Sequence, residues 1–285
     1  MGTNNILIDN KNVGEGNPVF IIAEVGINHN GNMESAKQLI KAAKESGASA
    51  VKLQTYITEK RVPKESPIFE LLKNCELSFS QTSELFNYGR ELGITIFSTP
   101  FDDESVDFLE SIKSPVYKVA SFDTINKSLL RRIGKTKKPV IMSTGMTNID
   151  ELNAAWKALG GKDDGSNCDL ALLHCVSSYP TPVNEANLSL ISLLHRLHQG
   201  PIGYSDHTIG VEIPIMSVAA GAQIIEKHFT LNTKDKGPDH ALSADPKVLK
   251  NLSDGIRRIE KILGKKEMRL RDVEKEIEQY RRKSD

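Results

Sequence analysis

The chain has 285 residues, 39% of them hydrophobic, so it can bury the core of one large domain or two small ones. Lys plus Arg and Asp plus Glu each number 37, which removes the general electrostatic attraction to nucleic acid or acidic membranes. No apolar run approaches the roughly 18 to 20 residues of a membrane span, and residues 1–12 lack the pattern of a signal peptide. We therefore expect a cytoplasmic protein whose partners are small molecules, with no binding to nucleic acid or membranes.

Cysteine usage is sparse. The three cysteines, Cys75, Cys168 and Cys175, have no CxxC spacing. This pattern disfavours both a disulfide framework and a zinc knuckle. We expect all three to be reduced and mainly to pack in the core.

From residue 19 onward, short apolar or β-branched runs alternate with amphipathic stretches. The runs that we expect to be strands are Val19–Ile27, Ala50–Thr55, Ile94–Ser98, Val116–Ala120, Val140–Ser143, Leu170–Val176, Ile202–Tyr204 and Gln223–His228. The stretches long enough for crossover helices include Glu34–Glu45, Gln81–Leu92, Asp103–Ile112, Asp150–Leu159 and Glu185–Leu197. The repeating unit is therefore a strand followed by a helix.

Eight such units predict an α/β protein with a (β/α)8 TIM barrel, a fold of about 250 residues. A doubly wound open sheet is the alternative, but Glu24–Gly31 does not match the glycine-rich GxGxxG fingerprint. We expect residues 1–18 to form a short N-terminal hairpin or cap around Ile6–Ile8, and residues 19–264 to form the barrel. Residues 265–285 are highly charged, which predicts an exposed helix, a frayed tail or a linker.

Two lysines lie inside otherwise apolar strands. An unpaired ammonium is costly to bury, so Lys52 and Lys118 each need an anion or a carboxylate partner. Core carboxylates such as Glu24 or Glu226 are one alternative, but two lysines at strand ends favour a bound phosphate or carboxylate. The hydroxyl donors that would complete such a cradle are Thr99, Ser121, Ser143 and Ser205. A Schiff base on Lys52 is the main mechanistic alternative.

Two histidines end the seventh and eighth expected strands, which are neighbours in a closed barrel. His207 and His228 could therefore share a metal, with a carboxylate and waters completing the shell. Such a mixed site suits Mn, Fe, Co or Zn and leaves positions open for chemistry. His29, His174 and His240 compete as ligands, because a single histidine is more often a hydrogen-bonded core residue.

The strand ends resemble, in order along the chain, those of the sialic acid synthase family, which includes bacterial N-acetylneuraminate synthases and their legionaminate and spore-coat relatives. The resemblance covers roughly Val19–Leu263, and its ordered set of motifs is more specific than any one of them. The matching segments are Ala23–Gly31, Lys52–Gln54, Ser98–Asp102, Tyr117–Ser121, Ser143–Met146, Tyr179–Pro182, Gly203–Thr208, Glu226–Phe229 and Asp239–Ser243.

This resemblance implies a transferase that condenses phosphoenolpyruvate with an N-acetylmannosamine-type sugar, using a divalent metal, typically Mn²⁺, with Mg²⁺ or Co²⁺ as alternatives. It further implies a homodimer. The implied metal ligands are His207 and His228, which with Glu24 form the catalytic group. The implied phosphoenolpyruvate contacts are Lys52, Thr99, Lys118, Ser121, Ser143, Ser177 and Ser205. The implied sugar contacts are Glu24, Gln54, Tyr179 and Asp239.

Two departures from the family pattern limit what the resemblance transfers. Some members have Asn where Ser177 stands, which weakens its assignment as a phosphate contact. Family members typically continue into a small antifreeze-like domain after a segment similar to Arg281-Arg282-Lys283-Ser284, where this sequence stops. We expect that domain to be absent, either because the sequence is a truncated form or because the barrel is used alone.

Several readings of the function stay open at this point. The sugar is N-acetylmannosamine, a related 2-acetamido sugar, or the 6-deoxy diacetamido analogue that an N,N'-diacetyllegionaminate synthase would take. A Schiff-base pyruvate aldolase is the nearest enzyme of another mechanism. An inactive sugar-phosphate-binding barrel is the alternative from another class, and the presence of the complete set of polar residues disfavours it.

Overall fold

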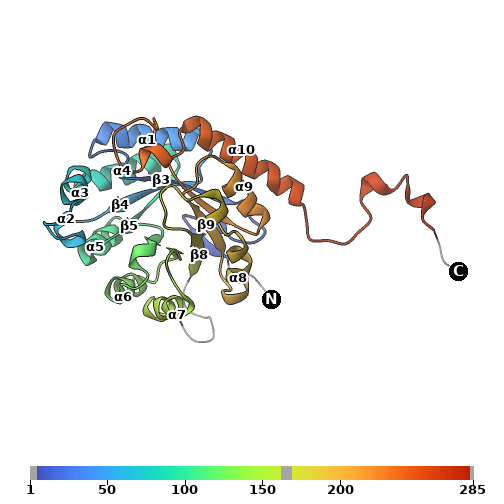
Figure 1. Cartoon of the computed structure of the whole chain (residues 1–285), viewed down its shortest axis with the longest axis horizontal. Helices are drawn as coiled ribbons and strands as arrows, with labels where there is room; N and C mark the ends of the chain where they lie inside the picture. The colour runs from blue at the N-terminus through green and yellow to red at the C-terminus, as the bar shows by residue number, and fades with distance from the viewer. Residues whose placement is uncertain (1–4, 162–168, 283–285) are drawn as a thin grey trace.

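Eight parallel strands close into a barrel in a computed structural model that describes residues 5–161 and 169–282 (Figure 1). Around the barrel the strands follow the order β10-β3-β4-β5-β6-β7-β8-β9, so strands consecutive in sequence are neighbours in space. The strands are β3 (Phe20–Gly26), β4 (Ala50–Thr55), β5 (Thr95–Pro100), β6 (Tyr117–Val119), β7 (Val140–Ser143), β8 (Leu170–Cys175), β9 (Ile202–Asp206) and β10 (Ile224–His228). The predicted (β/α)8 barrel is confirmed.

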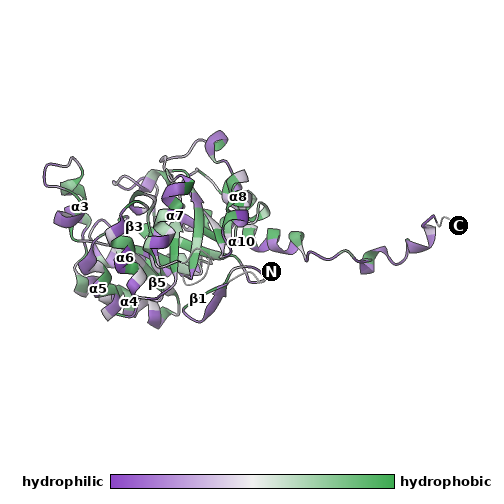
Figure 2. Ribbon diagram, turned by 90° about the horizontal axis from the view of Figure 1, so that it is seen from below, coloured by the Kyte–Doolittle hydropathy of each residue, from purple (hydrophilic) through white to green (hydrophobic). Residues whose placement is uncertain are grey.

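The helices form a ring outside the strands (Figure 1). Strand residues alternate between the barrel interior and the helix layer, which explains why both faces are apolar (Figure 2). The helices are α1 (Met33–Glu45), α2 (Thr58–Arg61), α3 (Phe69–Cys75), α4 (Phe79–Leu92), α5 (Asp103–Ser111), α6 (Lys127–Lys135), α7 (Ile149–Ala158), α8 (Ser189–Leu197), α9 (Glu212–Ala219) and α10 (Pro246–Leu263). The two short helices α2 and α3 extend the connection that follows β4, next to the cavity described below.

Local signals fix where the helices begin. Asp102 lies between β5 and α5 and is the N-cap of α5: its side chain accepts a hydrogen bond from the backbone N–H of Ser105 at 2.7 Å. Asn148 and Glu151 form a capping box at the start of α7. The expected helix Glu185–Leu197 begins later than predicted, at Ser189, because a 3₁₀ turn and a positive φ of 43° at Asn187 precede it.

The predicted N-terminal hairpin is present and closes one end of the barrel. β1 (Ile6–Ile8) pairs with β2 (Lys11–Val13) in antiparallel register. Ile6, Ile8 and Val13 are buried in a cluster with inward-facing apolar residues of the strands, including Phe20 and Phe97. This packing seals the end of the barrel opposite the carboxyl ends of the strands.

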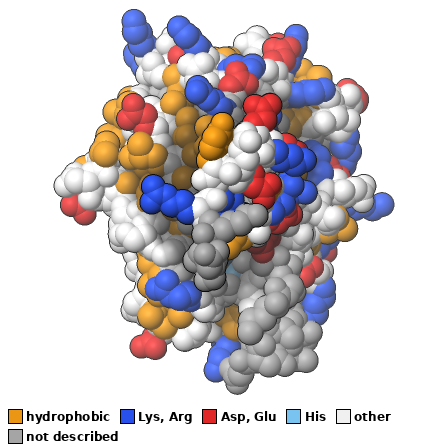
Figure 3. All heavy atoms as spheres, turned by 90° about the vertical axis from the view of Figure 1, so that its right-hand side faces the viewer, with side chains coloured by type: hydrophobic (Ala, Val, Ile, Leu, Met, Phe, Trp, Pro, Cys, Tyr) orange, Lys and Arg blue, Asp and Glu red, His pale blue; other side chains and the backbone are white. Residues whose placement is uncertain are grey.

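The charged tail extends away from the barrel (Figure 1). Its described part contains two exposed 3₁₀ turns, Asp272–Glu274 and Glu278–Tyr280, rather than the α-helix that was one expectation. Basic and acidic side chains are interspersed on the face from which the tail leaves (Figure 3), in keeping with the equal numbers of the two charge types. Among the described residues no helix is both long and apolar enough to cross a membrane.

The cysteines are only partly as expected. Cys75 and Cys175 are buried free thiols. Cys75 packs in a small apolar cluster, whereas Cys175 lines the cavity at the end of β8, so it is more than a packing residue. Cys168 lies outside the described residues.

Candidate active site

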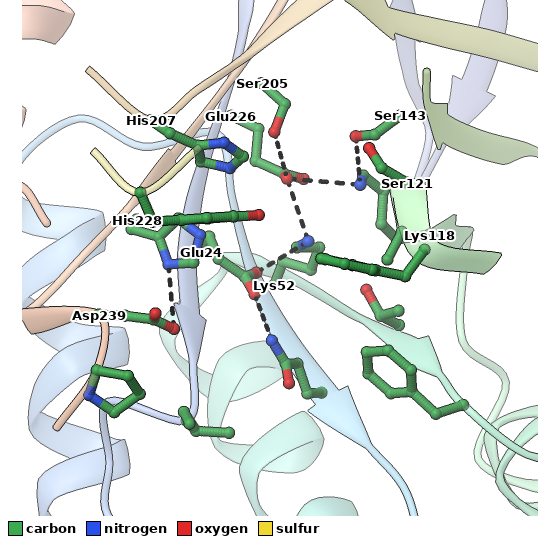
Figure 4. Close-up of a pocket in the computed structure, with 18 of the residues that line it drawn as sticks. Glu24, Lys52, Lys118, Ser121, Ser143, Ser205, His207, Glu226, His228 and Asp239 are labelled. Atoms are coloured by element: carbon green, nitrogen blue, oxygen red, sulfur yellow. Dashed lines mark hydrogen bonds and ion pairs between the residues drawn. The ribbon is translucent and has the colours of Figure 1, made fainter. Parts of the chain in front are cut away.

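A cavity of about 290 Å³ opens at the carboxyl ends of the barrel strands, the face on which barrel enzymes carry their catalytic groups (Figure 4). Nearly all residues predicted for the site line it. They are Glu24, Lys52, Gln54, Thr99, Lys118, Ser121, Ser143, Tyr179, Ser205, His207, His228 and Asp239. Ser177 is the exception: its hydroxyl lies next to Gly145, but the residue is not part of the cavity wall.

The register of the strands places Glu24, Lys52 and His228 at the same level along the barrel axis. Glu24 on β3 is paired with Lys52 on β4 and with His228 on β10. β3 bulges after Glu24, and Gly26 adopts a φ of 53° there. A Cβ at Gly26 would come within 3.0 Å of Glu24 Oε1 and 3.3 Å of Gln54 Nε2, so glycine both permits the bend and leaves room for these side chains.

Four charged side chains form one buried cluster (Figure 4). Lys52 Nζ lies 3.2 Å from Glu24 Oε2 and 3.2 Å from Glu226 Oε1. Lys118 Nζ lies 3.5 Å from the same Glu226 oxygen. The two lysines are therefore paired with core carboxylates, as the alternative interpretation of the sequence proposed. Glu24 Oε2 is engaged by the ion pair with Lys52, whereas Glu226 Oε2 is buried with neither an ion-pair nor a hydrogen-bond partner among the described residues, so the cluster retains one unused acceptor oxygen.

Burial and mutual interaction set the charges of this cluster. Burial raises the pKa of Glu24 to about 7, with Lys52 opposing the shift and Glu226 adding to it. Burial also raises the pKa of Glu226, but Lys118 and Lys52 outweigh it and hold that pKa well below its ordinary value. Burial lowers the pKa of Lys118 to about 8 against the pull of Glu226, whereas Glu226 and Glu24 outweigh burial and raise the pKa of Lys52. Near neutral pH two cations therefore face one full and one partial anion.

Hydroxyl groups surround the lysines. Ser143 Oγ accepts from Lys118 Nζ at 2.7 Å, and Ser205 Oγ donates to Glu226 at 3.1 Å. Ser121 Oγ accepts from the backbone N–H of Gly145 at 3.0 Å, and the Ser121 hydroxyl also interacts with the Cys175 thiol. Thr99 Oγ1 is buried without a hydrogen-bond partner. Donors thus converge on one end of the cavity.

The two imidazoles predicted as metal ligands are adjacent, with ring centroids 5.4 Å apart. His207 Nδ1 lies 2.8 Å from the carbonyl oxygen of Val176, and this hydrogen bond orients the ring so that Nε2 is left for another partner. Burial lowers the pKa of His207, but the interactions with Cys175 and the Val176 carbonyl outweigh it and raise that pKa. Burial and the neighbouring His207 hold the pKa of His228 well below its usual value, so this ring is neutral.

The donor chemistry fits a divalent cation with imidazole ligands. His228 Nδ1 is buried without a hydrogen-bond partner, and the nearest carboxylate oxygen, Asp239 Oδ2, lies 3.6 Å away. Over the described ranges, no group of three or more His, Cys, Asp or Glu side chains is arranged to hold a metal. The protein therefore offers two imidazoles, and water or substrate oxygens would have to complete the coordination shell.

The NeuB family model matches residues 39–268 of the sequence. The chain belongs to the NeuB family. This finding agrees with the resemblance to sialic acid synthases that the strand-end motifs indicate, and with the barrel on which those motifs lie.

Relatives and solved structures of the NeuB family match nearly the whole chain. An N,N'-diacetyllegionaminic acid synthase from Legionella pneumophila is 40% identical, over 100% of this chain and 84% of its own length. An uncharacterized protein from Methanocaldococcus jannaschii, MJ1065, is 48% identical over 91% of this chain and 76% of its own. The crystal structure of an N-acetylneuraminic acid synthetase from Leptospira borgpetersenii superimposes with a TM-score of 0.93 at 37% identity, covering 98% and 96% of the two chains. The prediction of an enzyme of the transferase class is thereby confirmed.

The other histidines that competed as ligands have internal hydrogen bonds in this NeuB-family chain. His29 Nδ1 accepts from the backbone of Gly31 at 3.0 Å, and burial lowers its pKa to about 4. His174 Nε2 bonds the carbonyl oxygen of Ala186 at 2.8 Å, and His240 Nδ1 lies 2.7 Å from Thr230 Oγ1. None of the three lines the cavity.

The outer part of the cavity contains the predicted sugar contacts. Gln54 Nε2 donates to Glu24 Oε1 at 3.2 Å, and the Tyr179 ring packs on His207 with centroids 4.0 Å apart. Sequence reasoning missed several cavity residues, because most of them lie on the loops and short helices that follow strands rather than in the strands. The missed lining residues are Ile27, Arg61, Ile68, Leu71, Leu72, Phe101, Ala120, Phe122, Cys175 and Pro238. The stretch 57–76 mixes apolar, basic and acidic residues, and it carried no motif that would have placed it here.

Proposed function

We propose that this chain condenses phosphoenolpyruvate with an open-chain 2-acetamido sugar to give a nonulosonic acid and inorganic phosphate. The observation that supports this most directly is the buried cluster of Lys52, Lys118, Glu24 and Glu226 facing a cavity beside two imidazoles. Relatives named as legionaminic, pseudaminic and sialic acid synthases agree with this chemistry.

Phosphoenolpyruvate would occupy the inner end of the cavity. Its phosphate and carboxylate would replace the carboxylates as partners of Lys52 and Lys118, which are both buried and close enough to share one anion. The hydroxyls available to complete this binding are those of Thr99, Ser121, Ser143 and Ser205. Ser177 Oγ is buried without a hydrogen-bond partner and lies outside the cavity wall, which argues against a direct phosphate contact by Ser177.

The sugar would lie toward Gln54, Tyr179 and Asp239, with its C1 aldehyde next to Glu24. C3 of phosphoenolpyruvate forms a bond to C1 of the sugar, and water adds to the cation left at C2. One proton of the water passes to a base, and the aldehyde oxygen takes up a proton to become a hydroxyl. The C2–O bond to phosphate then breaks as the new C2 hydroxyl gives up its proton and becomes the keto group, and inorganic phosphate leaves. Glu24 suits the proton transfers, because a pKa of about 7 keeps both of its forms populated near neutral pH.

His207 and His228 would hold the divalent metal, for which we propose Mn²⁺, with Mg²⁺ or Co²⁺ as substitutes. Such an ion supplies Lewis-acid polarisation of the aldehyde oxygen. The chain's own contribution is to keep the two rings in place: the Val176 carbonyl orients His207, and burial keeps His228 neutral. We further propose that the chain forms a homodimer and acts in the cytoplasm.

Two alternatives are weaker on this geometry. A Schiff base on Lys52 needs a neutral amine, but two carboxylates within 3.2 Å raise the pKa of that group. An inactive binding barrel leaves the imidazole pair beside Glu24 without a role. Borohydride trapping with pyruvate distinguishes the Schiff-base aldolase from the proposed synthase, because only the aldolase leaves a covalent adduct.

The test is phosphate release from phosphoenolpyruvate with a panel of acetamido sugars, run in ¹⁸O-labelled water with Mn²⁺. Attack of water at C2 places the label in the nonulosonic acid and leaves the phosphate unlabelled. Label in the phosphate would mean P–O cleavage and would contradict the proposed mechanism. Absence of phosphate release with every sugar would contradict the function.

A further inference from the structure

Arg61 is a cation in the outer wall of the cavity, and it forms no ion pair with a carboxylate among the described residues. It is the last residue of α2, and its side chain lines the cavity. Within residues 5–161 and 169–282, no Asp or Glu oxygen lies within 4.0 Å of its guanidinium nitrogens. A guanidinium offers five N–H donors and stays charged at neutral pH, although burial lowers the pKa of Arg61. Donors of this kind in a cavity wall call for an acceptor on a ligand.

The surroundings hold this guanidinium in one place. Arg61 Nη1 donates to Gln54 Oε1 at 3.0 Å, which uses one of the donors. Its Cζ lies 3.7 Å from the centroid of the Phe101 ring and 4.6 Å from that of Tyr56. No other hydrogen bond from the guanidinium is found in the described part of the chain. The remaining donors are therefore oriented by stacking and are free of protein acceptors.

The short helix that bears Arg61 is itself tied down. The carboxylate of Glu76 accepts from the backbone N–H of Thr58 at 2.9 Å and from its hydroxyl at 2.5 Å, which fixes the first turn of α2 against the end of α3. Asp102 Oδ2 accepts from the backbone N–H of Ile57 at 2.9 Å. Arg61 is thus presented by a rigid turn, so little ordering is needed when a ligand binds.

An apolar wall lies in the same outer part of the cavity. Leu72 and Phe101 line it from α3 and from the end of β5. Ile68 and Leu71 also line it while remaining 47% and 36% exposed, which is costly for side chains of this size unless something covers them. A donor beside apolar surface suits a group with a carbonyl oxygen and a methyl, which is the chemistry of an acetamido substituent.

On the basis of the proposed function, we infer that Arg61 and the wall formed by Ile68, Leu71, Leu72 and Phe101 make a subsite for the acylated amino groups of the sugar. Arg61 donates to an acyl oxygen, and the wall takes up methyl groups. Each buried methyl is worth about fourfold in affinity. The subsite therefore favours a 6-deoxy sugar with two acetamido groups over N-acetylmannosamine, which has one acetamido group and a polar C6 hydroxyl.

The experiment measures sugar binding by calorimetry and steady-state kinetics for the wild type and Arg61→Met, with the diacetamido 6-deoxy sugar, N-acetylmannosamine and mannose. We expect Arg61→Met to weaken binding of the acetamido sugars roughly ten- to hundredfold, the value of a hydrogen bond from a charged donor, with phosphoenolpyruvate affinity changed less than threefold. Binding of mannose, which lacks the acyl oxygen, should change less than threefold. The matched control, Arg131→Met, alters an exposed arginine on α6 and should change nothing.

The mannose arm separates direct contact from an indirect effect through Gln54. If Arg61 merely positions Gln54 and Glu24, Arg61→Met lowers turnover equally with all three sugars, and the inference is overturned. Arg61→Lys keeps the charge without the planar fork and should recover only part of the acetamido affinity. Thermal melting shows whether each variant is folded. If Arg61→Met is unfolded, Arg61→Lys is compared with the wild type in its place. Equal binding of N-acetylmannosamine and the diacetamido sugar by the wild type would also overturn the inference.

Binding and turnover separate this inference from the proposed function. Acetamido binding that depends on Arg61, without phosphate release, would contradict the function and leave the subsite standing. Phosphate release with no dependence of sugar affinity on Arg61 would contradict the subsite and leave the function standing. Failure of the wild type to bind any acetamido sugar would overturn both.

Discussion

Two buried lysine sites in the barrel differ in whether all the carboxylate oxygens of their partners accept a hydrogen bond or ion pair. Lys227 on β10 donates to Asp206 Oδ2 at 2.6 Å and to the carbonyl oxygen of Thr208 at 2.7 Å. The other carboxylate oxygen of Asp206 accepts from the backbone N–H and the hydroxyl of Thr208 at 3.0 and 2.8 Å. This closed pair ties the end of β9 to β10 and has no acceptor to spare.

The cluster of Lys52 and Lys118 is open by comparison. The two lysines share one oxygen of Glu226, while the other Glu226 oxygen is buried without a partner among the described residues. Because strand residues alternate, Glu226 and Lys227 are neighbours in sequence but lie on opposite faces of β10. Incomplete satisfaction on the inner face therefore indicates a ligand site, whereas complete satisfaction on the outer face indicates a structural role.

The largest expected effect is a loss of activity on substitution of the two imidazoles beside the open cluster. His207→Ala or His228→Ala should reduce phosphate release below detection while the melting temperature stays close to that of the wild type, because each removes one proposed metal ligand. Removal of metal with a chelator should abolish wild-type activity, and Mn²⁺ should restore it. His195→Ala, at an exposed histidine on α8, is the control and should remain active. Full activity in a chelator would contradict the metal role.

Glu24→Gln tests whether the open cluster moves protons. The substitution keeps size and polarity but removes the ionisable group, so turnover should fall by roughly 10² to 10⁴-fold, with phosphoenolpyruvate affinity changed less than threefold. Single-turnover kinetics and calorimetry measure the two quantities separately. A loss of turnover below about tenfold would leave Glu24 with only a contact to the sugar.

Lys227→Met tests the closed pair. It leaves the Asp206 carboxylate buried without its cation, so the free energy of unfolding should fall by about 3 to 5 kcal/mol in denaturant titrations. The double variant Lys227→Met/Asp206→Asn should recover part of this loss because the orphaned charge is gone. Unchanged stability combined with weakened phosphoenolpyruvate binding would mean that the closed pair belongs to the site after all.

Lys118→Met should show the opposite profile. Lys52 still pairs with Glu226 in this variant, so stability should change little. The dissociation constant for phosphoenolpyruvate should rise roughly ten- to hundredfold, since one charge-assisted contact is worth about 1.5 to 3 kcal/mol. Lys138→Met, which alters a lysine paired with Glu110 away from the cavity, is the control. A rise confined to the sugar KM would mean that the two halves of the site are assigned the wrong way round.

The smallest effect concerns pH. The pKa of Lys118 is lowered to about 8, first by burial and also by Lys52, while Glu226, Cys175 and Glu24 oppose the shift. The free protein therefore loses this positive charge as the pH rises through 8. Phosphoenolpyruvate affinity should fall by up to about tenfold between pH 7.5 and 9. Calorimetry should find this slope in the wild type and not in Lys118→Met; an equal slope in both would assign the titration to another group.

The succession of strands and helices was predictable from the sequence because periodicity and helix caps are local. The capping box at Asn148 and the apolar runs that became β4 and β7 are examples. The start of α8 was missed because the left-handed residue Asn187 carries no unambiguous signal, since asparagine is common in many turn positions.

The candidate site divides in the same way. The polar residues that end the strands were identified in the sequence, because a charged or imidazole side chain within an apolar run is conspicuous. Only the closed barrel decided which of them are free. It gave His29, His174 and His240 internal hydrogen bonds, paired Lys52 with two carboxylates, and brought Arg61 from a helix outside the strands to the cavity wall. Hydrogen-bond partners and burial depend on segments distant in sequence, so the pattern along the chain gives the chemical groups, and barrel closure decides which remain available to a ligand.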